Sequence, residues 1–293
     1  MKELPTPTLD LSPIALPRGS LHLQSPLCGE LAPARANGLA GNGTQAASQG
    51  ITVAWARHLD EVREAQQLRY SIFAGEMGAV LPRTMPGHDV DLFDDFCEHL
   101  LVRDVASGQV IGTYRVLTPA QAKRVGSFYS DTEFDLTRLR FMRERMVELG
   151  RSCVHADHRH GGVIMALWGA LADFMVRNQL DTMIGCASIP MQHQGPHGVV
   201  GGGHAAASIW HKLKQTHMAS VEFHVRPRLP LPVDRLDTSL DVEPPALIKG
   251  YLRLGAKILG APPWDPDFNA ADLPMMMRIA DLPSRYRKHF LGA

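Results

Sequence analysis

The segment Met146–Asn178, MVELGRSCVHADHRHGGVIMALWGALADFMVRN, constrains the fold more than any other part of the chain. It opens as a strand-like run that carries two charges, Glu148 and Arg151, and a turn with the pattern Arg159-x-x-Gly162 leads from it into an apolar helix. The first amides of a helix lack intrahelical acceptors, and the helix dipole is positive at that end. A basic, glycine-containing turn between a strand and a helix therefore predicts a phosphate site.

The elements on either side of this segment predict a mixed α/β fold. Residues 51–59 read as a first strand, and 59–75 as a helix with one apolar stripe. Two strands, 98–104 and 109–117, are separated by a short turn and read as a hairpin. A buried strand over 182–189 follows the apolar helix. Antiparallel strands thus come first, and a strand–helix–strand step lies in the middle.

The C-terminal part predicts further helices and strands. We expect helices over 206–216, 245–259 and 285–291, and strands over 221–225 and 274–280. Residues 1–50 are rich in Pro, Gly, Ala, Ser and Asn without a sustained period, which is typical of a flexible leader. The predicted organisation is that leader followed by a single domain over residues 51–293.

Composition excludes several classes of protein. The formal net charge is zero, which argues against a nucleic-acid binder that works by neutralising phosphates. The N-terminus has no basic-then-apolar signal pattern, and the longest apolar helix is too short to span a bilayer. We therefore expect a cytoplasmic protein, at most peripheral to the inner membrane.

Cysteines and histidines do not predict a metal site. The four cysteines form no CxxC pair, and we expect reduced thiols. The run His155–His160 contains three histidines in a turn and lacks the i, i+4 register of a helical zinc pair.

Several short blocks carry a resemblance to a known family. They are LRYSIF (68–73), DLFDDFCEHLLV (91–102), GTYR (112–115), ELGRSCV (148–154), GCAS (185–188), KGYLRLGA (249–256), DPDFN (265–269) with Asp272, and RYRKHF (285–290). With the Arg159-x-x-Gly162 turn they cover nearly everything from 51 to 293. In their order and number they resemble the bacterial ornithine lipid branch of the GNAT-superfamily N-acyltransferases.

The resemblance implies both a fold and an activity. The implied fold is GNAT-like, with a central mixed, mostly antiparallel twisted sheet flanked by helices and a C-terminal extension. The implied reaction moves a 3-hydroxyacyl group from acyl carrier protein to the α-amine of L-ornithine. It needs no cofactor besides the carrier's phosphopantetheine thioester. The first half also resembles acyl-homoserine-lactone synthases, so that activity remains an alternative, as does a non-catalytic acyl-carrier or lipid-binding module.

Three residues are candidates for the chemistry. Glu148 is the first candidate for the general base that deprotonates the amine, directly or through a water; the alternative is a structural salt bridge to Arg151. Such a pair needs a bulge, because residues i and i+3 of a strand face opposite sides. Arg115 either forms an ion pair with Asp91 or Asp94, or binds the substrate carboxylate.

Further residues are candidates for substrate binding. Asp91 and Asp94 are either turn acids or the site for the cationic side chain of ornithine. Arg69 orients an acid or touches the donor, and Phe73 belongs to the core or to the wall of an acyl tunnel. His99 is a base or, as the simpler alternative, a structural histidine.

The donor phosphate is expected at the turn before the apolar helix. Arg159 and the amides near Gly161 and Gly162 are the candidates, against the alternative of an ordinary exposed arginine. The turn departs from the usual GNAT pattern at Ile164, where a small residue is common. That departure favours the single phosphate of a carrier-bound arm over the pyrophosphate of free coenzyme A.

Overall fold

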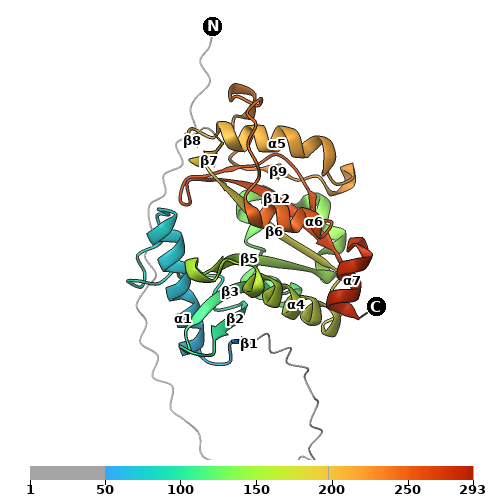
Figure 1. Ribbon diagram of the computed structural model, residues 1–293. Coiled ribbons are helices and arrows are strands. Elements are labelled where there is room, and N and C mark those ends of the chain that lie inside the picture. Colours follow the sequence, from blue (N-terminus) through green and yellow to red (C-terminus); the bar gives the residue numbers. More distant parts are fainter. Residues whose placement is uncertain (1–49, 197, 293) are drawn as a thin grey trace, which may run out of the picture. The chain divides into compact units, whose positions relative to one another are not determined.

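The computed structural model describes residues 50–196 and 198–292, all of which belong to one compact unit (Figure 1). The predicted leader, residues 1–50, lies outside the described residues apart from Gly50.

A mixed, mostly antiparallel sheet of eight strands forms the centre of this unit. The strand order is β1-β2-β3-β5-β6-β12-β10, with β11 paired to β12, and only the β5–β6 pair is parallel. This agrees with the fold class expected from the sequence. The strands are β1 (Ile51–Trp55), β2 (Glu98–Asp104), β3 (Val110–Leu117), β5 (Met146–Val154), β6 (Thr182–Pro190), β10 (Lys257–Ile258), β11 (Trp264–Asp265) and β12 (Ala270–Arg278).

The parallel pair separates soon after it begins. Strands β5 and β6 are joined by the crossover helix α4 (Gly162–Arg177), and they pair only from Met146 to Glu148 and from Thr182 to Ile184. Beyond this point β5 continues along β3, while β6 continues along β12. A gap therefore opens in the middle of the sheet, and it positions the site described below.

Helices α1 (Leu59–Tyr70) and α4 cover opposite faces of the sheet. Leu100 belongs to the core beneath α4, and the next residue, Leu101, belongs to the core beneath α1. Since neighbouring residues of a strand point to opposite faces, the two helices lie on opposite sides. A π-helical segment (Ser71–Glu76) extends α1.

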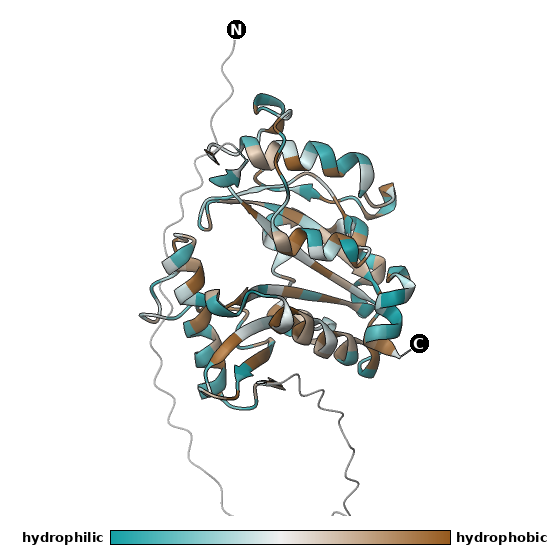
Figure 2. Ribbon diagram, in the orientation of Figure 1, coloured by the Kyte–Doolittle hydropathy of each residue, from teal (hydrophilic) through white to brown (hydrophobic). Residues whose placement is uncertain are grey.

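The other helices cover the second half of the sheet. Helices α5 (His204–Thr216) and α6 (Ala246–Arg253) share a core with β6 and β12, and α7 (Ser284–Leu291) contacts α4. Apolar colour concentrates on α4 and the central strands, whereas α7 is largely hydrophilic (Figure 2). None of the described helices is long and apolar enough to cross a membrane.

The segment between β3 and β5 is built from short pieces. It contains α2 (Pro119–Val125), α3 (Ser130–Glu133), β4 (Phe134–Asp135) and a 3-10 helix (Thr137–Arg145). Strand β4 pairs with β9 (Arg226–Pro227), and β7 (His193–Gly195) pairs with β8 (Gly198–Val200).

Four sequence-based element predictions were wrong, wholly or in part. The first strand, expected over 51–59, ends at Trp55. The strand expected over 221–225 is a 3-10 turn (Val221–Phe223), and Val221 is exposed. The helix expected over 245–259 ends at Arg253, because Gly255 has a φ of +89° and the chain then pairs with β12 as β10. Strand β12 begins at Ala270 rather than 274, since it pairs with β6 along its whole length.

A test of the separating strands is Gly185→Ala in β6. A methyl group at Gly185 would clash with the carbonyl oxygen of Leu149, the first β5 residue past the parallel pairing. We expect a loss of about 1–3 kcal/mol in unfolding free energy, measured by urea denaturation. The matched control is Gly169→Ala within α4, where the nearest atom is 3.9 Å away. The close approach would be refuted if both variants were as stable as the wild type.

Candidate active site

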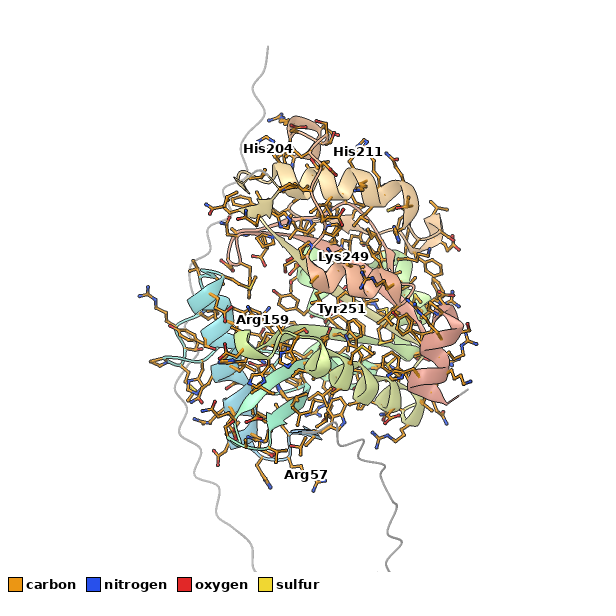
Figure 3. The ribbon with its side chains drawn as sticks, viewed as in Figure 1. Arg57, Arg159, His204, His211, Lys249 and Tyr251 are labelled. Atoms are coloured by element: carbon orange, nitrogen blue, oxygen red, sulfur yellow. The ribbon has the colours of Figure 1, made fainter. Side chains whose placement is uncertain are left out.

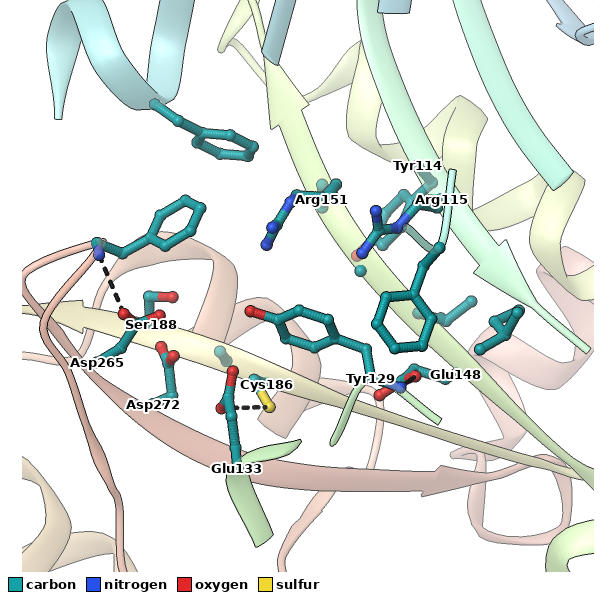
Figure 4. Close-up of a pocket in the computed structure, with 18 of the residues that line it drawn as sticks. Tyr114, Arg115, Tyr129, Glu133, Glu148, Arg151, Cys186, Ser188, Asp265 and Asp272 are labelled. Carbon is teal, nitrogen blue, oxygen red and sulfur yellow. Dashed lines mark hydrogen bonds between the residues drawn. The ribbon is translucent and has the colours of Figure 1, made fainter. Parts of the chain in front are cut away.

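A pocket opens where β5 and β6 diverge (Figure 4). Leu149, Gly150 and Arg151 of β5 line one wall, and Cys186 and Ser188 of β6 line the other. Past Glu148 the edge of β5 has no strand partner on this side. Backbone groups along that edge are therefore available to a ligand.

The side of the gap near α4 and α6 is lined by aromatic and apolar groups. The hydroxyl groups of Tyr114 and Tyr251 hydrogen-bond to each other, and Leu247 lies beside them in the pocket wall. Figure 3 shows Tyr251 between α6 and the strands below it. Burial raises the pKa of Tyr114 and Tyr251, so both hydroxyl groups are neutral donors at physiological pH.

The opposite side of the gap carries a closed ring of ion pairs. Three arginines and three aspartates alternate in it, so that every charge touches two of the opposite sign. The six contacts are Arg69–Asp89 (2.8 Å), Asp89–Arg151 (3.2 Å), Arg151–Asp91 (3.1 Å), Asp91–Arg115 (2.6 Å), Arg115–Asp94 (3.1 Å) and Asp94–Arg69 (2.8 Å). Helix α1, the loop before β2, strand β3 and strand β5 all contribute to it.

The ring brings together five residues that the sequence singled out separately and adds Asp89, which the sequence did not single out. Arg115 pairs with Asp91 and Asp94, which is the first of the two interpretations left open for it. Burial would raise the pKa of Asp94, but the charges of Arg69 and Arg115 outweigh it and hold that pKa well below its usual range. Because the oxygens of Asp91 and Asp94 already accept from arginines, capture of a substrate cation by these two acids stays a prediction.

A bulge brings Arg151 to the same pocket as Glu148. The β3–β5 register shifts between Thr113 and Arg115, and Arg151 has a φ of +50°. Positive φ is uncommon for a side-chain-bearing residue, so the position is backbone-strained. Arg151 pairs with Asp89 and Asp91, not with Glu148, and its guanidinium lies over the ring of Phe268 at 4.8 Å.

Glu148 is buried and anchors the turn that carries Tyr129. Its carboxylate accepts from the backbone N–H groups of Tyr129 (2.6 Å) and Ser130 (2.7 Å) and from the Ser130 hydroxyl. Burial raises the pKa of Glu148, while these hydrogen bonds oppose the rise. The side chain lines the pocket and has a structural task there, and its role as the general base stays a prediction.

The remaining predicted residues lie in different surroundings. Phe73 lines the pocket and packs edge-on against Phe268. His99 is buried outside the pocket, where its Nε2 lies 3.0 Å from the carbonyl oxygen of Asp94 and burial lowers its pKa. This environment is that of a structural histidine.

The predicted phosphate turn is present at the start of α4. Arg159 donates to the carbonyl oxygen of Val154 and forms a half-exposed pair with Glu76 at 2.6 Å. Gly161 adopts a left-handed conformation with φ +100°, and α4 begins at Gly162 without a side-chain cap.

Sequence reasoning assigned no role to a second group of acids in the pocket. Glu133, Asp265 and Asp272 have carboxylate oxygens within 4.8 Å of one another, a separation that also suits a metal ion. Asp265 and Asp272 lie in a block that the family resemblance covers, but Glu133 is far away in sequence. No spacing rule links α3 to the start of β12, so only the fold reveals the cluster.

Comparison with known proteins gives the following relatives. The model of a protein family described as "Acetyltransferase (GNAT) domain" matches residues 68–169. An L-ornithine N(alpha)-acyltransferase of Rhodobacter capsulatus is 33% identical over 84% of this chain and 96% of its own length. One of Agrobacterium fabrum is 36% identical over 81% of this chain and 84% of its own. Among solved structures, the AHL synthase LasI is similar with a TM-score of 0.48 and 12% identity, over 83% of this chain and 94% of that one.

The ring of ion pairs predicts a large effect for Asp94→Asn. The variant keeps the shape of the side chain but leaves the buried guanidinium groups of Arg69 and Arg115 short of a counter-charge. We expect a loss of about 3–5 kcal/mol in unfolding free energy, measured by urea denaturation. Glu144→Gln, which breaks the exposed pair with Lys123, should cost less than about 1 kcal/mol. Equal losses in the two variants would contradict a special role for the ring.

Proposed function

Because the chain belongs to the family of the L-ornithine N(alpha)-acyltransferases, we propose that it moves a 3-hydroxyacyl group from acyl carrier protein to the α-amine of L-ornithine. The product is a lyso-ornithine lipid, the first intermediate of ornithine lipid biosynthesis. The chain is an acyltransferase, and the observation that supports this reaction best is the gap between β5 and β6. One side of the gap is aromatic and the other is charged, which suits an acyl donor and a zwitterionic acceptor.

The donor arm would enter from the side of α4. Its phosphate would bind the first amides of α4 and Arg159. The Arg159–Glu76 pair is half exposed, and such pairs contribute only about 0–1 kcal/mol, so a phosphate can replace Glu76. The pantetheine would then follow the free edge of β5 and present its thioester at the gap.

The chemistry requires no covalent enzyme intermediate. The α-amine nitrogen attacks the thioester carbonyl carbon, a C–N bond forms, and the C–S bond breaks. Backbone N–H groups on the free edge of β5 would stabilise the oxyanion. Glu148 would accept the proton from the amine, and the carrier's thiolate would leave and take up a proton.

The acceptor would bind on the charged side of the gap. Arg151 lies in the pocket wall beside Tyr129 and Phe268 and is the guanidinium proposed for the α-carboxylate (Figure 4). This moves the carboxylate-binding role from Arg115, which the ring holds with only 4% of its side chain exposed.

A cytoplasmic enzyme that meets the inner membrane only at its surface would suit a carrier-bound donor and a lipid product. The proposed contact for the acidic carrier or for anionic lipid heads is a set of basic residues in the C-terminal part. They are Lys249, Arg253, Lys257, Arg285, Arg287 and Lys288.

A direct assay tests the proposed reaction. Purified protein with 3-hydroxyacyl carrier protein and L-ornithine should release the carrier's free thiol and form an N-acylated product, detected by mass spectrometry. Absence of thiol release with every amino acid would refute the proposal. A lactone formed only with S-adenosylmethionine would establish the acyl-homoserine-lactone synthase alternative instead.

Glu148→Gln tests the general base. An amide cannot accept the proton, so we expect kcat to fall by roughly two to four orders of magnitude. The matched variant is Ser130→Ala, which removes one hydrogen bond to Glu148 but keeps the carboxylate, and it should retain most of the activity. Full activity of Glu148→Gln would exclude this residue as the base.

A further inference from the structure

Three carboxyl groups meet at the end of the pocket opposite Arg151. Glu133 comes from α3, Asp265 from β11 and Asp272 from β12, and all three line the pocket. Figure 4 shows them on the far side of Tyr129 from Arg115, with Arg151 across the pocket. Their closest oxygens all lie within 4.8 Å of one another.

No basic side chain of the described residues forms a salt bridge with any of these three acids. Arg115 and Arg151 are already balanced within the ring. Like charges this close repel one another, and burial adds to the cost of ionising them. Burial first, and the neighbouring acid second, raises the pKa of Glu133 to about 8.

Asp272 shows that the cluster is incomplete by itself. Asp272 is only 3% exposed. Its Oδ1 has no hydrogen-bond partner in the described part of the chain. Asp265 uses one oxygen to accept from the backbone N–H groups of Asp267 and Phe268, and Glu133 accepts from the Cys186 thiol. A buried acceptor without a partner is destabilising unless a ligand supplies the donor.

The chemistry of the cluster suits a primary ammonium group. An ammonium carries one positive charge and three N–H donors, one for each carboxyl group. Phe268 and Tyr129, which line the same pocket, would cover the methylene groups next to it. Three carboxyl groups with waters could also hold a hard metal ion, but the aromatic rings and the thiol that border the cluster suit an ammonium on an apolar chain better.

We propose that Glu133, Asp265 and Asp272 bind the side-chain ammonium of the acceptor amino acid and so select acceptors that carry a terminal amine. This inference rests on the proposed function, since it concerns the acceptor of that reaction. Arg151 would hold the α-carboxylate across the pocket, and the α-amine would then face the gap where the thioester arrives. The acceptor is thus fixed at both ends, by an arginine and by acids.

The test compares two acceptors that differ only in the terminal amine. L-Ornithine and L-2-aminopentanoate have the same carbon chain, and thiol release from 3-hydroxyacyl carrier protein measures kcat/KM for each. We expect the wild-type enzyme to prefer ornithine by about 100-fold or more. In Asp272→Asn and Glu133→Gln that preference should fall by about tenfold or more, because the KM for ornithine rises. Turnover of 2-aminopentanoate by these variants should stay within about threefold of the wild-type value.

Controls distinguish a failure of the ammonium site from a failure of the proposed acyl-transfer reaction. Asp241→Asn, at an acid whose side chain is 96% exposed, should leave the preference unchanged. A wild-type enzyme that uses both acceptors equally well would overturn the ammonium site and leave the acyltransfer reaction standing. No transfer to any amino acid would overturn the reaction itself. The wild-type comparison needs no variant, so it can overturn the ammonium site even if the variants do not fold.

Two further outcomes would also overturn the ammonium site. One is an equal loss for both acceptors in variants whose thermal unfolding matches the wild type. The other is activity that EDTA abolishes and Mg²⁺ or Mn²⁺ restores, which would make the cluster a metal site.

Discussion

The ring of six alternating charges is the interaction on which the acceptor side of the site depends. It joins α1, the loop before β2, strand β3 and strand β5 into one unit. Removing six charges from water is costly, and alternation repays the cost because each ion touches two of the opposite sign. The ring also holds Arg151 in its strained left-handed conformation, which points the guanidinium into the pocket rather than through the sheet.

The ring lies next to a pocket only because β5 and β6 separate there. A regular parallel pair would close β5 against β6 and use the backbone groups on both edges. Here pairing stops at Glu148, and Gly185 allows a close approach to Leu149 just past the last pair. The same split leaves an aromatic side with Tyr114 and Tyr251 and a charged side with Arg115 and Arg151, and in the proposed reaction the donor and the acceptor would enter from these two sides.

Local patterns predicted most of the fold, and long-range geometry accounts for what they missed. The segment 146–178 read correctly as strand, turn and helix, because its periodicity and glycines are local signals. The short strand β10 and the early start of β12 depend on pairing with distant strands, which no local window contains. Arg69, Arg115 and Arg151 were recognised one by one, but the sequence did not show that they share three aspartates. Glu133 was missed because α3 gives no local sign that it faces β12.

The acids of the ring and the acids that line the pocket differ in how their charges are paired. Asp89, Asp91 and Asp94 are each paired with two arginines, so the ring is neutral as a unit. Glu133, Asp265 and Asp272 lie across the pocket from Arg151 (Figure 4) and form no salt bridge with a basic side chain of the described residues. A neutral ring contributes rigidity without attracting a cation. The three acids have no such counter-charges, so their end of the pocket is negatively charged. In the proposed binding mode, an acceptor amino acid would therefore place its side-chain amine at these acids, near the start of β12, and its carboxylate toward Arg151 of β5.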